Sequence, residues 1–162
     1  MKNEKTAEKP NFTEMKPGEL TDYIISTHHA YLKKTLPETY SLFMKVLRVH
    51  GEHHPELYEV FSLFGELKTD LDQHLIKEEM LLFPAIEDGD KTKAAGLIAR
   101  IKDEHTGLEK LFGRIKAASH DYSLPPDACQ SYTGLYKTIK EMEDDIHQLL
   151  HLENDILFRG IA

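Results

Sequence analysis

The sequence predicts an all-α protein, an up-down-up-down four-helix bundle that forms one domain. Three observations support this prediction. Four long segments repeat their apolar residues every three or four positions, as the buried face of a helix requires. The links between these segments are short and contain Pro, Gly and Asp. No segment of useful length alternates apolar and polar residues as a half-buried strand does. Long amphipathic helices joined by short links pack as antiparallel neighbours.

The first helix follows a polar amino-terminal stretch. Residues 1–18 are rich in Lys and Glu and close with a Pro-Gly pair, so we expect a flexible leader there and the bundle over 19–162. Helical spacing of apolar residues begins at Leu20 and continues to Gly51. Pro37 interrupts this pattern, which predicts a kink or a restart of the helix at that residue.

Three more helices follow. The second spans about 55–85 and begins with a proline that suits a first helical turn. The third spans about 97–115, after an Asp-Gly-Asp turn and before a Pro-Pro pair. The fourth spans about 135–157, and Asp127 near its start is a possible cap.

Composition excludes several functional classes. The net charge of -8 is spread along the chain with both signs mixed, so there is no basic stripe for nucleic acid. No apolar run approaches the roughly 18 to 20 residues of a membrane span, and the first residues carry charges where a signal peptide has its apolar core. We therefore expect a cytoplasmic protein without membrane or nucleic-acid partners. The single cysteine, Cys129, agrees with a reducing compartment.

Ten histidines among 162 residues are the unusual feature of the composition. Several of them, and two glutamates, fall on the apolar stripes of the predicted helices; these residues are His74, Glu78, His105 and Glu153. Burying such groups costs several kcal/mol unless a partner compensates, and a metal ion is such a partner. His74 and Glu78 lie four residues apart, about 40° around a helix, so their side chains project to one point. A single pair of this kind is usually a surface or capping pair, but similar groups on several core faces favour a metal site.

Five stretches of the sequence resemble a known family in their order and spacing. They are THHAYLKKTLPE at 27–38, VHGEHHPEL at 49–57, DLDQHLIKEEMLLFPAI at 70–86, DEHTGLEKLF at 103–112 and DDIHQLLHLENDILF at 144–158. Over residues 19–160 the chain resembles the hemerythrin-like di-iron proteins, and within them the RIC (repair of iron centres) proteins.

The resemblance implies a site and a function. It implies two non-haem irons with oxo or hydroxo and carboxylate bridges, and it places the ligands at His29, His74, Glu78, His105 and Glu153. Glu78 and Glu153 would be the bridging carboxylates. RIC proteins are linked to rebuilding iron-sulfur clusters damaged by nitric oxide or peroxide, and hemerythrin-like centres bind or reduce small diatomic molecules such as oxygen. The expected partners are therefore these small molecules and iron-sulfur client proteins.

The sequence departs from the family pattern in two ways. Many RIC proteins have an additional small amino-terminal domain with a Cys-Cys pair, and here that region has only the polar stretch. The family also has a histidine four residues before the glutamate of the last helix, where this sequence has Leu149. His147 or His151 could replace it through a local helix distortion, or one iron position could stay open to water or a small ligand. His28 is an alternative to His29, although motif spacing favours His29.

Three residues near the motifs are kept outside the ligand set. His50 is tempting because the family often has a histidine there. It follows His29 by 21 residues, about 31 Å along a helix, so we interpret it as a helix-terminus or loop residue. Asp70 and Glu104 flank the ligand positions and could accept an imidazole proton or be solvated charges.

Three functional hypotheses follow. The leading one is a cytoplasmic di-iron stress protein that helps to restore iron-sulfur clusters by delivering iron or by handling nitric oxide. The second is a carrier or sensor that binds oxygen or nitric oxide reversibly. The third is a structural bundle that has lost its metal, for which Leu149 is the argument. No nucleophile triad, phosphate loop or zinc-type cysteine cluster appears, so no catalytic residue is assigned and enzymatic activity stays open.

Overall fold

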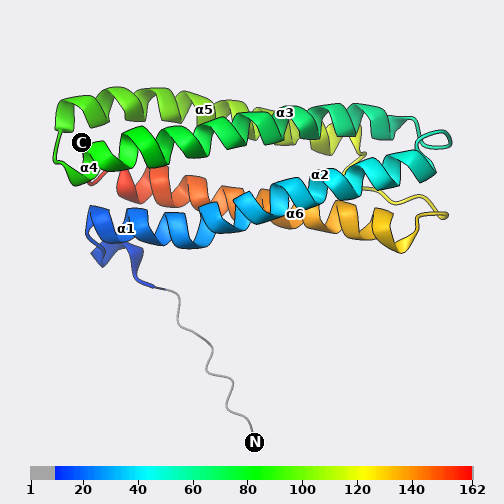
Figure 1. The fold of residues 1–162 in the computed structure, drawn as a ribbon, viewed down its shortest axis with the longest axis horizontal. Helices are drawn as coiled ribbons and strands as arrows, with labels where there is room; N and C mark the ends of the chain where they lie inside the picture. Colours follow the sequence, from blue (N-terminus) through cyan, green and yellow to red (C-terminus); the bar gives the residue numbers. More distant parts are fainter. Residues whose placement is uncertain (1–9, 162) are drawn as a thin grey trace, which may run out of the picture.

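The computed structural model describes residues 10–161, and within that range it is helical with no strand. Four helical arms lie side by side and alternate in direction (Figure 1). The first arm joins α1 (Pro17–Ile24), the π-helix η2 (Ile25–His29) and α2 (Ala30–His50), and the second joins α3 (Glu56–Lys77), the π-helix η3 (Glu78–Leu82) and α4 (Phe83–Glu87). The third arm is α5 (Lys91–Ala118), and the fourth joins α6 (Gln130–His151) to the π-helix η4 (Leu152–Leu157). The prediction of an all-α four-helix bundle is confirmed.

Helical structure begins earlier than the sequence suggested. A 3-10 helix, η1 (Phe12–Glu14), precedes α1, and Pro17 occupies the first turn of α1, where its missing N–H costs nothing. The ring of Phe12 lies 5.0 Å from that of Tyr23, centroid to centroid. Part of the expected leader therefore packs on the bundle. Residues 1–9 of the expected leader lie outside the described range.

Helix α2 continues through Pro37, so the predicted restart at this proline is wrong. A proline inside a helix costs about 3 kcal/mol because it removes a backbone hydrogen bond. Leu32, Leu36 and Phe43 on the same helix are fully buried, and each such side chain contributes about 1.5 to 3 kcal/mol. Packing of the apolar face therefore outweighs the local cost.

The ends of two helices differ in how they are capped. Asp90 caps α5 by accepting a hydrogen bond from the Lys93 backbone N–H at 3.1 Å. The predicted cap Asp127 does not cap α6, because its carboxylate contacts the His54 imidazole at 2.9 Å instead. Cys129 occupies the N-cap position of α6 and makes no side-chain capping bond.

The three π-helices occur where candidate ligands lie. A π-helix has i to i+5 hydrogen bonds, and these segments are rare and frequently mark functional sites. The bonds run from the Ala30 N–H to the Ile25 carbonyl, from Phe83 to Glu78 and from Phe158 to Glu153. His29 closes η2, Glu78 opens η3 and Glu153 is the second residue of η4. The local geometry thus changes on three arms at one level of the bundle.

The core is apolar along most of the bundle and polar at that level. The buried charged or polar side chains there are His29, His74, Glu78, His105 and Glu153. Among residues 10–161 no helix is both long enough and apolar enough to cross a membrane.

Candidate metal centre

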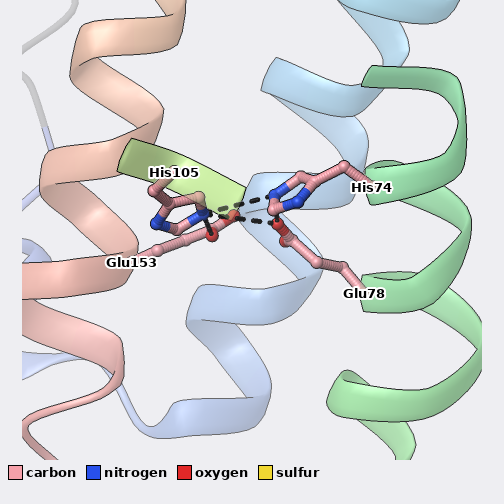
Figure 2. Close-up of side chains that lie close together, drawn as sticks. All are labelled: His74, Glu78, His105 and Glu153. Carbon is pink, nitrogen blue, oxygen red and sulfur yellow. Dashed lines mark hydrogen bonds and ion pairs between the residues drawn. The ribbon is translucent and has the colours of Figure 1, made fainter. Parts of the chain in front are cut away.

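Four side chains from three arms meet inside the bundle (Figure 2). His105 Nε2 on α5 lies 3.0 Å from Glu153 Oε2 and 3.2 Å from His74 Nε2. Glu78 Oε1 contacts His74 Nε2 one turn away on the same arm. One ligand-type atom from each of the four side chains lies within 4.8 Å of the others. This spacing suits a small group of metal ions.

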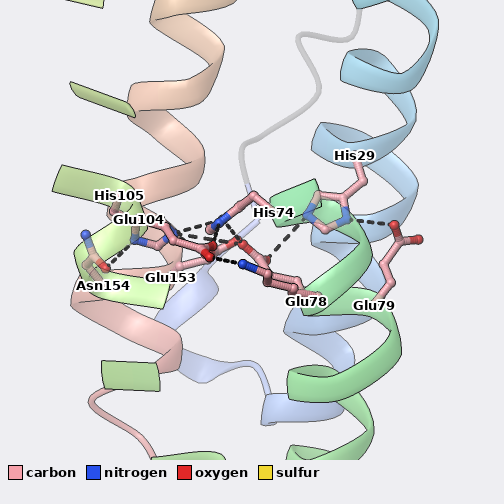
Figure 3. Close-up of polar contacts among 9 residues, drawn as sticks. His29, His74, Glu78, Glu79, Glu104, His105, Glu153 and Asn154 are labelled. Carbon is pink, nitrogen blue, oxygen red and sulfur yellow. Dashed lines mark hydrogen bonds and ion pairs between the residues drawn. The ribbon is translucent and has the colours of Figure 1, made fainter. Parts of the chain in front are cut away.

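The first arm adds His29. Its Nε2 lies 3.5 Å from Glu78 Oε2, on the opposite side of that carboxylate from His74 (Figure 3). The neighbouring His28 turns away, and its Nδ1 lies 3.1 Å from Asp145 Oδ1. Of the two alternatives in the sequence, His29 is therefore the one that faces the centre.

Each inward imidazole has an oxygen behind it. The Nδ1 atoms of His74, His105 and His29 lie 2.7 Å from Glu104 Oε2, 2.8 Å from Asn154 Oδ1 and 3.4 Å from Glu79 Oε2. The oxygens behind His74 and His105 are within hydrogen-bond distance, so they hold the proton on Nδ1 and leave Nε2 as a lone-pair donor toward a metal, whereas the Glu79 oxygen makes only a longer contact with His29. All three Nε2 atoms therefore point to the centre.

The sequence indicates these outer partners only in part. Glu104 directly precedes His105 in the chain, but it contacts His74 on the neighbouring arm. Asn154 and Glu79 carry no signal in the sequence beyond following a candidate bridging glutamate. Asp70, the other candidate, is exposed.

Electrostatics inside the site favour a cation. Burial raises the pKa of Glu153 well above its ordinary value, and the adjacent charge of Glu78 raises it further. Burial also opposes ionisation of Glu78, but the close Glu153 carboxyl group and the surrounding imidazoles outweigh it and hold the pKa of Glu78 well below its usual range. Burial lowers the pKa of His105, yet the two neighbouring glutamates raise it to about 10. Two buried carboxylates this close need positive charge beside them if both are to be ionised.

Unpaired polar atoms point to the same conclusion. Both oxygens of Glu78, both oxygens of Glu153 and both ring nitrogens of His29 are buried without a hydrogen-bond partner among the described residues. Leaving such an atom unpaired costs about 1 to 3 kcal/mol. The donor set is imidazole nitrogen and carboxylate oxygen without sulfur, which suits iron in a bundle core.

The fourth arm offers no imidazole to this centre. Leu149 is 1% exposed and lies one turn before Glu153. His147 is exposed, and the side chain of His151 is 63% exposed with Nδ1 2.7 Å from Asp155 Oδ2. The distortion of this helix, η4, starts at Leu152, so it does not rotate either histidine inward.

A cleft reaches the site from the surface. It has a volume of about 450 Å³ and runs between α3 and α5, with His74 in its wall. Three carboxylates and three cationic side chains line it: Glu66, Asp70 and Glu104, and Lys77, Lys110 and Arg114. Lys77 pairs with Glu104, and Arg114 with Glu66. The cleft is therefore balanced in charge and gives small molecules a short route to His74.

Comparison with known proteins agrees with this geometry. The family described as "Hemerythrin HHE cation binding domain" matches residues 20–161. The iron-sulfur cluster repair protein DnrN of Neisseria gonorrhoeae is 36% identical over 89% of this chain and 90% of its own length. The iron-sulfur cluster repair protein YtfE of Citrobacter koseri and a probable iron-sulfur cluster repair protein of Haemophilus influenzae are each 34% identical, over 90% and 91% of this chain. The match covers 66% of the length of each of these last two. The chain belongs to the hemerythrin HHE cation-binding family and, within it, groups with the iron-sulfur cluster repair proteins.

Proposed function

We propose that this protein holds two non-haem irons and helps to restore iron-sulfur clusters damaged by nitrosative or oxidative stress. The observation that carries the proposal is the buried pair Glu78 and Glu153, whose four oxygens are unpaired between arms that also supply three imidazoles. The relatives are named iron-sulfur cluster repair proteins, and for this reason we propose iron-sulfur proteins as the clients.

The side chains divide into two groups around Glu78. One carboxylate oxygen faces His29 and the other faces His74 and His105, so this residue would bridge two ions. Glu153, beside His105, would be the second bridge. When bound, the two irons would supply coordination positions and electrons for a small molecule such as nitric oxide, oxygen or peroxide.

The protein's own residues would control access and retention. The complete burial of Glu78 and Glu153 keeps bulk water from the bridges, which strengthens their attraction for cations. Leu149 supplies no donor on the fourth arm, so one iron would have an exchangeable position. The cleft beside His74 would let that iron leave or a small molecule enter. Delivery of iron needs such a weakly held ion.

Cluster repair can be tested with isotopes. The reduced protein loaded with 57Fe is mixed with a [4Fe-4S] protein previously treated with nitric oxide, and the client is re-isolated for Mössbauer spectra and activity. Delivery predicts 57Fe in the restored cluster, and nitric oxide handling predicts restoration with the client's own iron. Equal restoration by the iron-free Glu78→Ala variant would overturn both.

A reversible carrier or sensor is the second candidate, and the missing donor at Leu149 favours it too. In that case the reduced protein forms a stable adduct with nitric oxide or oxygen that is released intact. Stopped-flow absorption followed by gas exchange distinguishes this behaviour from turnover.

The oxygen behind His105 should matter for metal affinity. Asn154→Ala removes the partner of Nδ1, and loss of such a partner typically weakens metal binding about 10- to 100-fold. Competition with a calibrated chelator measures the change. Gln148→Ala, an exposed position on the same arm, is the matched control and should leave affinity unchanged. Equal affinity in both variants would show that Asn154 does not support a ligand.

A further inference from the structure

We propose a second metal site, for a single zinc ion, at the end of the bundle opposite the iron centre. Its ligands are His50, His54, Asp127 and Cys129. The iron centre uses none of these residues, and the proposal does not depend on the function proposed above.

The four residues come from two connections that meet at one end of the molecule. His50 is the last residue of α2, and His54 lies in the turn before α3. Asp127 and Cys129 lie in the loop that leads into α6, and both connections are at the end away from α1 and α4 (Figure 1). Along the first arm, 21 residues or about 31 Å separate His50 from His29. The site is therefore independent of the iron centre in space.

The donor atoms are already close together. His50 Nε2 lies 3.1 Å from Cys129 Sγ, and His54 Nε2 lies 2.9 and 3.0 Å from the two oxygens of Asp127. Ligand-type atoms of His50, His54 and Asp127 all lie within 4.8 Å of one another, and Cys129 Sγ, which is outside this group of three, contacts His50 alone. With metal-ligand bonds of about 2.0 to 2.3 Å, donors around a tetrahedral zinc ion are about 3.3 to 3.6 Å apart. Each of the two contacting pairs would open by about half an ångström around the ion. The exposed Cys129 side chain would also turn toward His54 and Asp127 to complete the tetrahedron.

The backbone and an aromatic side chain hold the two imidazoles in place. The His54 N–H donates to the His50 carbonyl at 2.9 Å, which fixes the spacing of a His-x-x-x-His pair, one that structural zinc sites use. Tyr132 is buried, and its ring lies 5.1 Å from His50 and 6.2 Å from His54, centroid to centroid. His50 is 7% exposed and the His54 side chain 17%. The imidazoles thus form a preorganised inner wall.

Asp127 and Cys129 form the solvent-facing side of the proposed site, and their ligand types determine which metal ion it would prefer. Asp127 and Cys129 are exposed, so an ion can enter without unfolding the bundle. Two imidazoles, one thiolate and one carboxylate suit the borderline-soft zinc ion, whereas calcium and magnesium prefer oxygen ligands alone. Cys129 caps α6 without a side-chain hydrogen bond to its backbone, so ligation would not break a cap.

Cobalt(II) is the probe because it replaces zinc and is coloured. Cys129 is the only cysteine of the chain, so a thiolate-to-cobalt charge-transfer band can arise only from this residue. We expect the iron-loaded protein to show that band with one cobalt per chain and tetrahedral ligand-field bands, and zinc to remove them. Cys129→Ser should abolish the charge-transfer band. His54→Ala and Asp127→Asn should each weaken cobalt binding about tenfold or more, because even the loss of a hydrogen-bond partner behind a ligand typically weakens metal binding about 10- to 100-fold.

Two control variants distinguish this site from the iron centre and from the remaining surface histidines. His53→Ala changes an exposed histidine of the same turn and should leave the titration unchanged. Glu78→Ala, without its iron, should keep the cobalt bands, because the two sites share no ligand. No charge-transfer band, or a band unchanged in both His54→Ala and Asp127→Asn, overturns the proposal, since the second result describes a thiol that binds cobalt alone.

Discussion

Replacing Glu78 with alanine is expected to leave the bundle folded and without iron. Glu78 is fully buried, and its two oxygens face imidazoles on opposite sides, so its loss would remove one ligand from each ion at once. We expect bound iron to fall from the proposed two ions per chain to near zero. Elemental analysis of protein purified without oxygen measures this, and Glu87→Ala, an exposed glutamate on the same arm, should retain both ions.

The fold of the variant should survive because the glutamate does not stabilise the bundle by itself. A buried carboxylate with two unpaired oxygens is a cost that only a bound cation offsets. Circular dichroism and thermal unfolding of the iron-free proteins should therefore show no loss of helix and no large drop in stability for Glu78→Gln, which keeps the volume of the side chain. Two irons per chain in Glu78→Ala would show that this residue is not a bridge.

Leu149→His is expected to strengthen iron binding. The position is buried one turn before Glu153, and four residues advance about 400° on a helix, so a histidine there would join the face that carries the glutamate. One more imidazole donor should slow iron loss to a chelator about tenfold or more. Even the loss of a hydrogen-bond partner behind a ligand typically changes metal affinity about 10- to 100-fold. Mössbauer spectra should then show two sites of equal occupancy.

The surface histidines of the same arm provide the contrast. His147 and His151 are exposed, and His151 pairs with Asp155. His147→Ala and His151→Ala should therefore keep the iron content of the parent protein. Loss of iron in either one, together with no gain in Leu149→His, would mean that the helix rearranges to bring that histidine to the metal.

The helices were predictable because their burial pattern is local. The period of three or four residues follows from helix geometry alone, and the same stripes revealed the polar residues His74, Glu78, His105 and Glu153. Whether these residues and His29 bind iron stays a prediction, and the structure shows only that they lie together.

The features that the sequence did not predict depend on contacts between residues that are distant in the sequence. Pro37 does not restart its helix because packing against other arms outweighs its local cost. Asp127 pairs with His54, 73 residues away, rather than capping the helix that follows it. Asn154, on the fourth arm, hydrogen-bonds to His105 on the third arm. The fourth arm becomes π-helical at Leu152, and the extra residue in such a turn rotates every later side chain around the helix axis. No local pattern encodes such an insertion.

The π-helices bear on two separate timescales, the local opening of a helical turn and the unfolding of the whole bundle. Each one breaks the regular hydrogen-bond ladder beside a candidate ligand, whereas α5 and the long parts of α2, α3 and α6 are uninterrupted α-helix. We expect these turns to open more often than the uninterrupted helices, because the regular hydrogen-bond pattern is broken there, and amide hydrogen exchange would report such opening. An ion held at His29, Glu78 and Glu153 would then be able to leave when single turns open. The residence time of the ion would then be independent of the lifetime of the fold, and one folded molecule would be able to lose and rebind its metal repeatedly.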